Sequence, residues 1–342
     1  MSPRAQRPTL KDVAREAGVS IKTVSRALND EPRISAATRK KVLEVVAALG
    51  FRPNTLARHM RAGGRDRAVA LVIPDMANPF FGSVAAGVES VIRDHGLTLI
   101  VGSSDEEPDR ERLLVTTFLD RQAAALLIVP TAASEHGYLR AERQRGLAIV
   151  FIDRPPVRLT ADCVVSANYE GARAAVDHLA AQGHRRIAFL GDTPITLYTR
   201  QERFRGYRSA LEAAGLRADP ALVAHAHATV DSAAITQELL ALPDPPTAIF
   251  AANNLVCMGV VTALSRSRRW DVAVVGFDDF TLADAFDPGI TVMAQDTARL
   301  GSTAAELALA RLEGDRSRAR TVTLPTTLVR RGSGEVPVPA LA

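Results

Sequence analysis

The 342-residue chain is poor in several residue types, and each shortage excludes a class of protein. It has two cysteines, Cys163 and Cys257, which lie far apart in apolar runs and form no CxxC pair. This excludes a disulfide framework and a cysteine-based zinc site, and we expect both side chains to be small and buried. The longest apolar runs, such as residues 123–129, fall short of the ~18–20 residues that span a bilayer.

The first residues also lack a feature that a secreted protein would carry. MSPRAQRPTLKDVAREAG has no apolar stretch of the kind found in secretory signals. We therefore expect a soluble, cytoplasmic protein with no membrane partner. A hydrophobic content of 47% and a charged content of 23% are ordinary for globular chains, and the length suggests two or three domains.

Lysine is scarce, and its distribution divides the chain. All four lysines lie within the first 41 residues. Residues 1–65 hold fourteen Lys and Arg against five Asp and Glu, a net charge of +9, which leaves −5 on the remainder. A small basic module on a mildly acidic body indicates that only the module has a polyanionic partner.

The basic module is predicted to contain three short helices. Thr9 followed by Asp12 resembles a capping box at the start of the first helix, and Gly18 ends that helix because glycine readily adopts a positive φ. A second helix follows over residues 21–28 and a third over residues 36–49. Two helices joined by a tight turn and braced by a third are typical of a helix-turn-helix.

In a helix-turn-helix, the second helix enters the major groove and its N-terminal residues reach the base edges. The residues expected to read bases are Ile21, Lys22, Ser25 and Arg26. Arg26 can donate two bonds to guanine, whereas Ile21 offers apolar contact only. The remaining DNA-binding candidates lie at helix starts and loops: Thr9, Leu10, Ser20, Thr23, Asn29, Arg33, Ser35 and Thr38. A three-helix interaction module with a solvated basic face is the alternative, and the charge favours DNA.

Two strings carry a family resemblance. TLKDVAREAGVSIKTVSRALND, followed by ISAATRKKVLEVVAALGFRPNTLARHMRAG, resembles the headpiece of the lactose-repressor (LacI/GalR) family of bacterial transcription regulators. The resemblance implies a hinge helix that folds when two protomers pair on DNA and inserts an apolar side chain into the minor groove. The matching residues are Asn54, Ala57, Met60 and Arg61. Met60 stands where the family usually has leucine.

The remaining sequence alternates between apolar runs and helix-length segments. The expected strands cover residues 69–73, 97–101, 126–129, 149–152, 187–190, 248–251 and 272–275. Helices are expected at residues 80–95, 110–122, 169–182, 203–214, 231–242 and 255–266. Continuous apolar strands that alternate with helices predict an α/β body of two doubly wound parallel-sheet subdomains.

The body resembles the same family over DMANPFF, FIDRP, NYEGARAAVDHLAAQGHRRIAFLG, RFRGYRSALEAAGL, FAANN, VAVVGFDDF and LPTTLVRRGS. This implies a periplasmic-binding-protein-like (type I) core with three crossovers between its subdomains. The domain boundaries that follow are a headpiece at 1–53, a hinge and linker at 54–65, a body at 66–335 and a tail at 336–342. Subdomain one would cover about 66–164 and 293–321, and subdomain two about 165–292 and 322–332.

The resemblance also implies a small-molecule site between the subdomains, at the carboxyl ends of strands. The positions carried over are Asp75, Phe80, Phe81, Asp153, Arg203, Asn253, Asp278 and Gln295. These side chains suit a polyol, because carboxylates accept from hydroxyls, arginine and amides donate, and an aromatic face covers a sugar ring. Asn254 stands where the family usually has Asp, which removes a charge near the cleft. The C-terminal EVPVPALA has no leucine heptad, so we expect a homodimer on a pseudo-palindromic operator.

Enzyme signatures are absent from the sequence. There is no GxxxxGK[ST], no GxGxxG that opens a helix after the first strand, and no GxSxG. His225 and His227 have no third partner for a metal, so we expect no catalytic residues, metal or cofactor. The function expected is a repressor whose operator affinity is controlled allosterically by a sugar or sugar derivative, through induction or corepression. The alternatives are a nucleobase or nucleoside corepressor and a DNA-tethered α/β enzyme.

Overall fold

The computed structural model describes residues 8–28, 31, 34–51 and 68–338 of the chain. The chain divides into two compact units, residues 1–66 and residues 67–342. The expected hinge helix and linker at 54–65, with Asn54, Ala57, Met60 and Arg61, lie outside the described residues. The DNA-contact candidates Asn29 and Arg33 lie outside them as well.

The first unit is the predicted three-helix module, made of α1 (Leu10–Ala17), α2 (Ile21–Leu28) and α3 (Ala36–Ala48). The capping box at Thr9 is confirmed, because the Thr9 amide donates to Asp12 Oδ2 at 2.9 Å while Thr9 Oγ1 accepts from the Asp12 amide at 3.4 Å. Gly18 ends α1 with a φ of 64°. The predicted second helix has the observed bounds, and the third ends one residue before its predicted end.

A small apolar core holds the three helices together. Val13 and Ala17 of α1, Val24 and Ala27 of α2 and Val42 of α3 are almost fully buried. Because these positions recur at helical spacing, each helix buries one face and leaves the opposite face in solvent. The packing of α2 therefore leaves its N-terminal Ile21 and Lys22 exposed.

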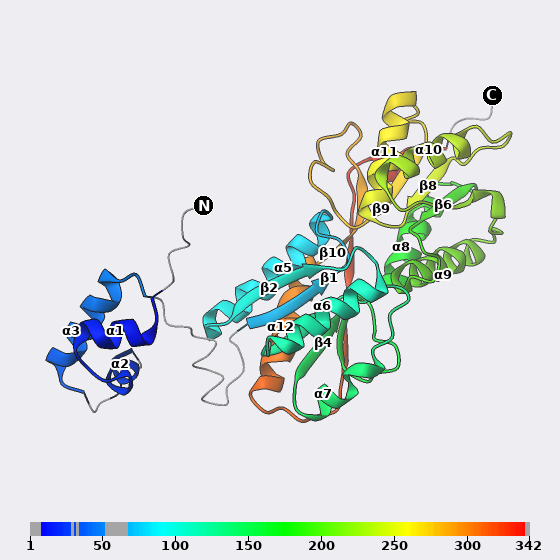
Figure 1. Cartoon of the computed structure of the whole chain (residues 1–342). Helices are drawn as coiled ribbons and strands as arrows, with labels where there is room; N and C mark the ends of the chain where they lie inside the picture. The colour runs from blue at the N-terminus through cyan, green and yellow to red at the C-terminus, as the bar shows by residue number, and fades with distance from the viewer. Residues whose placement is uncertain (1–7, 29–30, 32–33, 52–67, 339–342) are drawn as a thin grey trace. The chain divides into compact units, whose positions relative to one another are not determined.

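The second unit contains two six-stranded sheets (Figure 1). In spatial order, the first sheet consists of β11 (Thr321–Leu324), β5 (Asp162–Ser166), β4 (Ala148–Ile152), β3 (Ala125–Ile128), β1 (Ala68–Ile73) and β2 (Thr98–Ser103). The second consists of β12 (Thr326–Val329), β10 (Thr291–Gln295), β9 (Ala273–Phe277), β8 (Ala248–Ala251), β6 (Ile187–Gly191) and β7 (Val223–His225). The expected α/β fold class is confirmed, with one correction: β12 runs antiparallel to β10.

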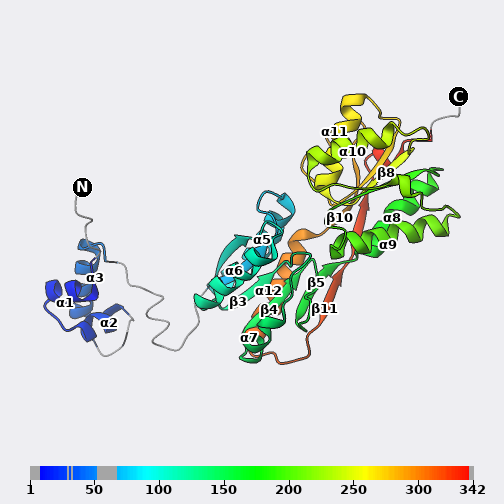
Figure 2. The same cartoon turned by 45° about the vertical axis from the view of Figure 1, so that its right-hand side comes forward.

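The chain passes between the sheets three times. It crosses after β5, after β10 and after β11, so the late α12 (Thr297–Leu312) and β11 lie beside β4 and β5 (Figure 2). Each crossing lies a few residues C-terminal to the expected position. Strands β5, β7, β10, β11 and β12 were not among the strands expected from the apolar runs. Strands β7, β11 and β12 are short and only half-buried, whereas β5 and β10 are largely buried but begin and end with polar residues.

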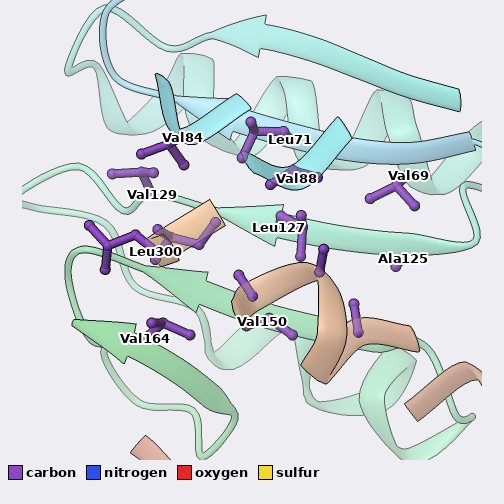
Figure 3. Close-up of a cluster of buried hydrophobic side chains, with 14 of the residues drawn as sticks. Val69, Leu71, Val84, Val88, Ala125, Leu127, Val129, Val150, Val164 and Leu300 are labelled. Carbon is purple, nitrogen blue, oxygen red and sulfur yellow. The ribbon is translucent and has the colours of Figure 1, made fainter. Parts of the chain in front are cut away.

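Helices cover both faces of each sheet. On the first sheet, α5 (Pro79–Ile92) and α12 pack on one face, and α6 (Pro108–Asp120) and the short α7 (Arg140–Gln144) lie on the other side. On the second sheet, α8 (Asn168–Ala181) and α9 (Tyr198–Ala213) cover one face and α10 (Thr229–Leu240) and α11 (Asn254–Ser267) the other. Figure 3 shows the first core, with Val84, Val88 and Leu300 from the helices against Leu71, Leu127 and Val150 from the strands.

Short 3-10 helices complete the second unit: η1 (Arg93–His95), η2 (Gly137–Leu139), η3 (Pro220–Leu222) and η4 (Ser333–Glu335). Cys163 and Cys257 are free and buried in apolar cores, as expected. Within the described part of the chain, no helix combines the length and the apolarity needed to cross a membrane.

Two glycines allow α5 and α12 to cross in close contact. A Cβ at Gly87 of α5 would overlap the backbone oxygen of Ala298, and a Cβ at Gly301 of α12 would overlap the backbone oxygen of Val84. The backbones therefore meet where any side chain would hold them apart. Since α12 arrives from the end of the sequence, this contact fixes a late segment against the first sheet.

We predict opposite effects for alanine at two glycines of the same helix. Gly87→Ala should lower the free energy of unfolding by about 1–3 kcal/mol, because the α5–α12 contact cannot accommodate a methyl group. Gly82→Ala is the matched control, since a Cβ there has no atom within 4 Å. It should raise stability by roughly 0.5–1 kcal/mol through its better helix propensity. Urea unfolding of the full chain measures both, and equal effects of the two would contradict the close contact.

Candidate DNA-binding surface and effector cleft

Helix α2 presents the side chains expected to read bases. Ile21 is 44% exposed and Lys22 is exposed beside it, whereas Ser25 and Arg26 are partly exposed on the next turn. Val24 and Ala27, on the opposite side of the helix, are buried in the core. The helical packing thus separates the candidate DNA face from the buried face, as the amphipathic pattern predicted.

Intramolecular contacts occupy several of these side chains in this structure. Arg26 Nε lies 3.5 Å from Glu31 Oε2. Ser20 Oγ accepts from the Thr23 amide at 3.1 Å, and Ser35 Oγ accepts from the Thr38 amide at 3.2 Å. The hydroxyl groups therefore cap helices, and Arg26 has to leave its exposed carboxylate partner to bind a base.

In the second unit, a cavity of about 300 Å³ opens between the two sheets. All eight effector candidates line it: Asp75, Phe80, Phe81, Asp153, Arg203, Asn253, Asp278 and Gln295. Asp75, Asp153 and Asp278 follow strands β1, β4 and β9, and Asn253 is the N-cap of α11. Phe80 and Phe81 lie in the first turn of α5, Arg203 lies on α9, and Gln295 is the last residue of β10. The fold thus brings together positions that are up to 220 residues apart in the sequence.

Asp153 and Asp278 hold equivalent positions in the two subdomains. Each directly follows the strand that stands third in its sheet, and each is left-handed, with φ of 67° and 70°. Each amide donates to the neighbouring strand, Asp153 to Val164 O at 2.8 Å and Asp278 to Met293 O at 2.9 Å. The repeated geometry places one buried carboxylate from each subdomain on the cavity wall.

The environment of Asp153 favours its protonated form. Burial raises the pKa of this carboxyl group, the charge of Asp278 adds to the rise, and the nearby Arg154 and Arg203 oppose it. Its Oδ2 lies 3.4 Å from Arg154 Nε, and its Oδ1 is buried without a hydrogen-bond partner. Since buried polar atoms are nearly always satisfied, this oxygen is available to a ligand hydroxyl.

Arg203 is held rigidly in the wall of the second subdomain. Its Nε donates to Asn168 Oδ1 at 2.8 Å and its Nη1 donates to Ala252 O at 2.6 Å, while Asp278 Oδ2 lies 3.5 Å from Nη1. Its guanidinium carbon stacks 3.8 Å from the centre of the Phe277 ring. Gln295 Nε2 donates to the other oxygen of Asp278, which leaves Gln295 Oε1 without a partner.

Asn253 connects the start of α11 to the loop after β6. Its Oδ1 accepts from the Val256 amide at 2.8 Å and caps α11, and its Nδ2 donates to Asp192 Oδ2 at 2.9 Å. His227 Nδ1 lies 3.3 Å from the other oxygen of Asp192, and this hydrogen bond raises the pKa of His227. Within the described residues, no three His, Cys, Asp or Glu side chains are placed to hold a metal ion.

Asn254, the residue that departs from the family pattern, bridges the two subdomains. Its Nδ2 donates to Asn78 Oδ1 at 2.8 Å, and its Oδ1 accepts from Asn78 Nδ2 at 3.5 Å. The same Asn78 oxygen accepts from the Phe80 amide at 3.0 Å and caps α5. Asn78 must therefore present an acceptor to Asn254, and the amide of Asn254 supplies the matching donor.

Several lining residues were not predicted from the sequence, namely Asn78, Asp105, Glu106, Arg154, Asp192, Thr199, Arg200 and His227. Arg154 donates from Nη2 to Glu106 Oε1 at 2.8 Å and from Nη1 to Glu106 Oε2 at 3.0 Å, so the loops after β2 and β4 are tied together. Polar residues that follow a parallel strand were a usable signal for Asp192 and Arg154. Arg200 lies three residues before Arg203 on α9, which is also a readable spacing.

The comparisons with known proteins agree with both units. Residues 9–54 match the model "Bacterial regulatory proteins, lacI family", and residues 176–334 match "Periplasmic binding protein-like domain". The transcriptional repressor CytR of Escherichia coli (strain K12) is 30% identical over 336 residues, which are 95% of this chain and 96% of CytR. CytR is a transcription regulator rather than an enzyme.

Solved structures extend this similarity to the fold. The lac repressor dimer bound to operator and the anti-inducer ONPF is 25% identical, with a TM-score of 0.80 over 96% of this chain and 99% of that one. The transcriptional regulator CelR–cellobiose complex is 30% identical, with a TM-score of 0.69 over 96% of this chain and all of that one. By sequence and by fold, the chain belongs to the lacI family of bacterial regulatory proteins.

Proposed function

We propose that this protein is a homodimeric repressor whose affinity for a pseudo-palindromic operator is controlled by a sugar or sugar derivative bound between its body subdomains. One observation carries the proposal. Eight residues selected from the sequence, drawn from both subdomains, line one cavity in a chain that also carries a helix-turn-helix. A chain with only one of these features would bind DNA or a ligand, but would not couple the two.

The chemistry of the cavity suits hydroxyl groups. Asp153 Oδ1 and Gln295 Oε1 are buried acceptors without partners, and each can accept from a ligand hydroxyl. Phe80 and Phe81 border the same space and offer an aromatic surface to the apolar side of a sugar ring. CelR, a relative of similar fold, was solved in complex with cellobiose, which supports this ligand class.

The coupling would act through the relative position of the two subdomains. A ligand that contacts Asp153 from one subdomain and Asp278 from the other favours whichever arrangement brings both within reach. The three crossovers are the covalent links about which the subdomains can rotate. The lac repressor was solved as a dimer bound to operator, which supports a dimer here. The two hinge segments of such a dimer would respond to this rotation. The proposal is compatible with induction and with corepression.

Operator binding measured against a ligand panel tests the effector. Monosaccharides, sugar acids and nucleosides at millimolar concentration are added to full-length protein on its operator, and at least one sugar or sugar derivative should change the Kd about 5–150-fold. Asp278→Asn should lose this response, because the variant lacks the charge that pairs with Arg203 and accepts from Gln295.

Arg205→Ala is the matched control. Arg205 lies two residues from Arg203 on α9, is exposed, and pairs with Glu202 outside the cavity. This variant should respond as the wild type does. A response to nucleosides alone would overturn the ligand class, no response to any compound would overturn effector control, and a normal response in Asp278→Asn would show that the site is misplaced.

Arg26→Ala tests base reading by α2. The variant should bind its operator about 1–3 kcal/mol more weakly and lose its preference at one position of each half-site, since a bidentate contact to guanine is removed. Arg15→Ala is the control, because Arg15 carries the same charge on the exposed face of α1. Gel-shift assays on a set of single-base operator variants give the profile. A uniform loss of affinity on every sequence would instead assign Arg26 to phosphate contact.

The bridge between Asn78 and Asn254 should stabilise the observed arrangement of the subdomains. Asn254→Ala is expected to lower the free energy of unfolding of the body by about 1 kcal/mol, because Asn78 loses a donor. Asn78→Asp is the comparison variant and should lose less stability, since its carboxylate still accepts from Phe80 and from Asn254 and only the 3.5 Å donation from Asn78 Nδ2 to Asn254 Oδ1 is removed. Thermal unfolding of both variants measures the difference, and an equal loss of stability would argue against the bridge.

A further inference from the structure

Arg200 is a buried cation on the cavity wall that the proposed effector contacts leave unused. It lies in the first turn of α9, is 9% exposed, and lines the cavity with Thr199 and Leu197. Its guanidinium carbon is 4.7 Å from the centre of the Phe204 ring and 5.6 Å from that of Phe189. The two rings therefore fix the plane of the guanidinium.

The polar partners of Arg200 are incomplete. Its Nη2 lies 3.2 Å from Nε2 and 3.3 Å from Nδ1 of His225, and its Nε is buried without a hydrogen bond. Burial, followed by the charge of Arg200, lowers the pKa of His225, so this partner stays uncharged at neutral pH. Arg200 thus has a neutral neighbour where a buried cation ordinarily has an anion.

The other cations of the cavity differ from Arg200 in this respect. Arg154 pairs with Glu106, Arg203 with Asp278 and His227 with Asp192. Among the residues that the structure describes, no Asp or Glu oxygen lies within 4.0 Å of an Arg200 nitrogen. Within this part of the chain, Arg200 therefore differs from the other three cations of the cavity in having no acidic partner.

The start of α9 adds a second, independent feature at the same place. Leu197 is the N-cap residue and supplies no side-chain hydrogen bond, so the first-turn amides of this 16-residue helix have no side-chain cap. The positive end of the helix dipole and the Arg200 charge lie together, which is unfavourable until an anion joins them. Thr199, which is 5% exposed, brings a hydroxyl group to the same turn.

We propose that Arg200, Thr199 and the first turn of α9 form a subsite for an anionic substituent of the effector, a carboxylate or a phosphate. The inference rests on the proposed function and narrows its ligand to a polyol with one anionic group. The remaining wall holds the carboxylates of Asp75, Asp192 and Asp278, which accept from hydroxyls and repel an anion. The ligand is therefore oriented, with its anionic end at α9 and its hydroxyls toward the carboxylates.

Inorganic phosphate tests the subsite without knowledge of the effector. At about 50 mM, phosphate should raise the Tm of the full-length protein by about 2 °C above sodium chloride of equal ionic strength, by mass action on the folded state. Arg200→Met should abolish this difference, because methionine retains the packing against Phe189 and Phe204 without the charge. Arg200→Gln is a second variant that can still donate to His225, and it should lose the difference as well.

Arg208→Gln is the control for the loss of a positive charge from the same helix. Arg208 is exposed and lies outside the cavity, so the variant should keep the full phosphate effect. A wild-type Tm that rises no more in phosphate than in chloride would overturn the subsite. An undiminished phosphate effect in both Arg200 variants would place the ion elsewhere and overturn it equally.

Two further arms identify the anion and separate the subsite from the proposed function. Acetate and phosphate at equal ionic strength compare the two groups, and the one that gives the larger Arg200-dependent rise is the substituent expected on the effector. The operator assay is then run with the panel compound that changes the wild-type Kd. A neutral polyol that acts equally on wild type and Arg200→Met would support the proposed function and overturn the anionic subsite. A sugar acid or sugar phosphate with at least tenfold less effect on Arg200→Met would support both.

Discussion

Both sheets of the body direct the carboxyl ends of their parallel strands toward one cleft, and the candidate site depends on this constraint. A residue that follows such a strand leaves the apolar layer and reaches the cavity. Asp75, Asp153, Asp192 and Asp278 all follow strands in this way. Because the two sheets share the same strand order, equivalent carboxylates from two separate segments of the chain stand on the two walls of the cleft.

Packing in the sheets makes this concentration of charge possible. The central strands are buried on both faces by helices, so their ends are held in fixed positions. The close crossing of α5 and α12 at Gly87 and Gly301 then attaches the segment after β10 to the first subdomain. Gln295, the last residue of β10, stands directly before this crossover and donates to Asp278. A polar site of this kind needs rigid support, because an unpaired buried group is costly.

The cleft combines two electrostatic regions. Arg154 and Arg203 are neutralised by Glu106 and Asp278, whereas Arg200 has aromatic rings and a neutral imidazole around it. Burial raises the pKa of Asp153, and its Oδ1 has no hydrogen-bond partner. A ligand with hydroxyls at one end and an anionic group at the other would satisfy both. The bridge from Asn78 to Asn254 joins the walls that such a ligand contacts.

The sequence by itself determined the three-helix module and most of the central strands, through helical spacing around Val13 and Val24 and through continuous apolar runs. The eight candidate contacts were named from the family resemblance of the motifs that contain them. Only the tertiary structure decided which strands pair through the crossovers, that β12 is antiparallel, and which buried charges have partners. Half-buried strands such as β11 carry weak apolar patterns. Arg200 lacks an acidic partner because, among the described residues, no carboxylate from a distant part of the sequence folds close to it. Both result from contacts between segments far apart in the chain, which local patterns do not specify.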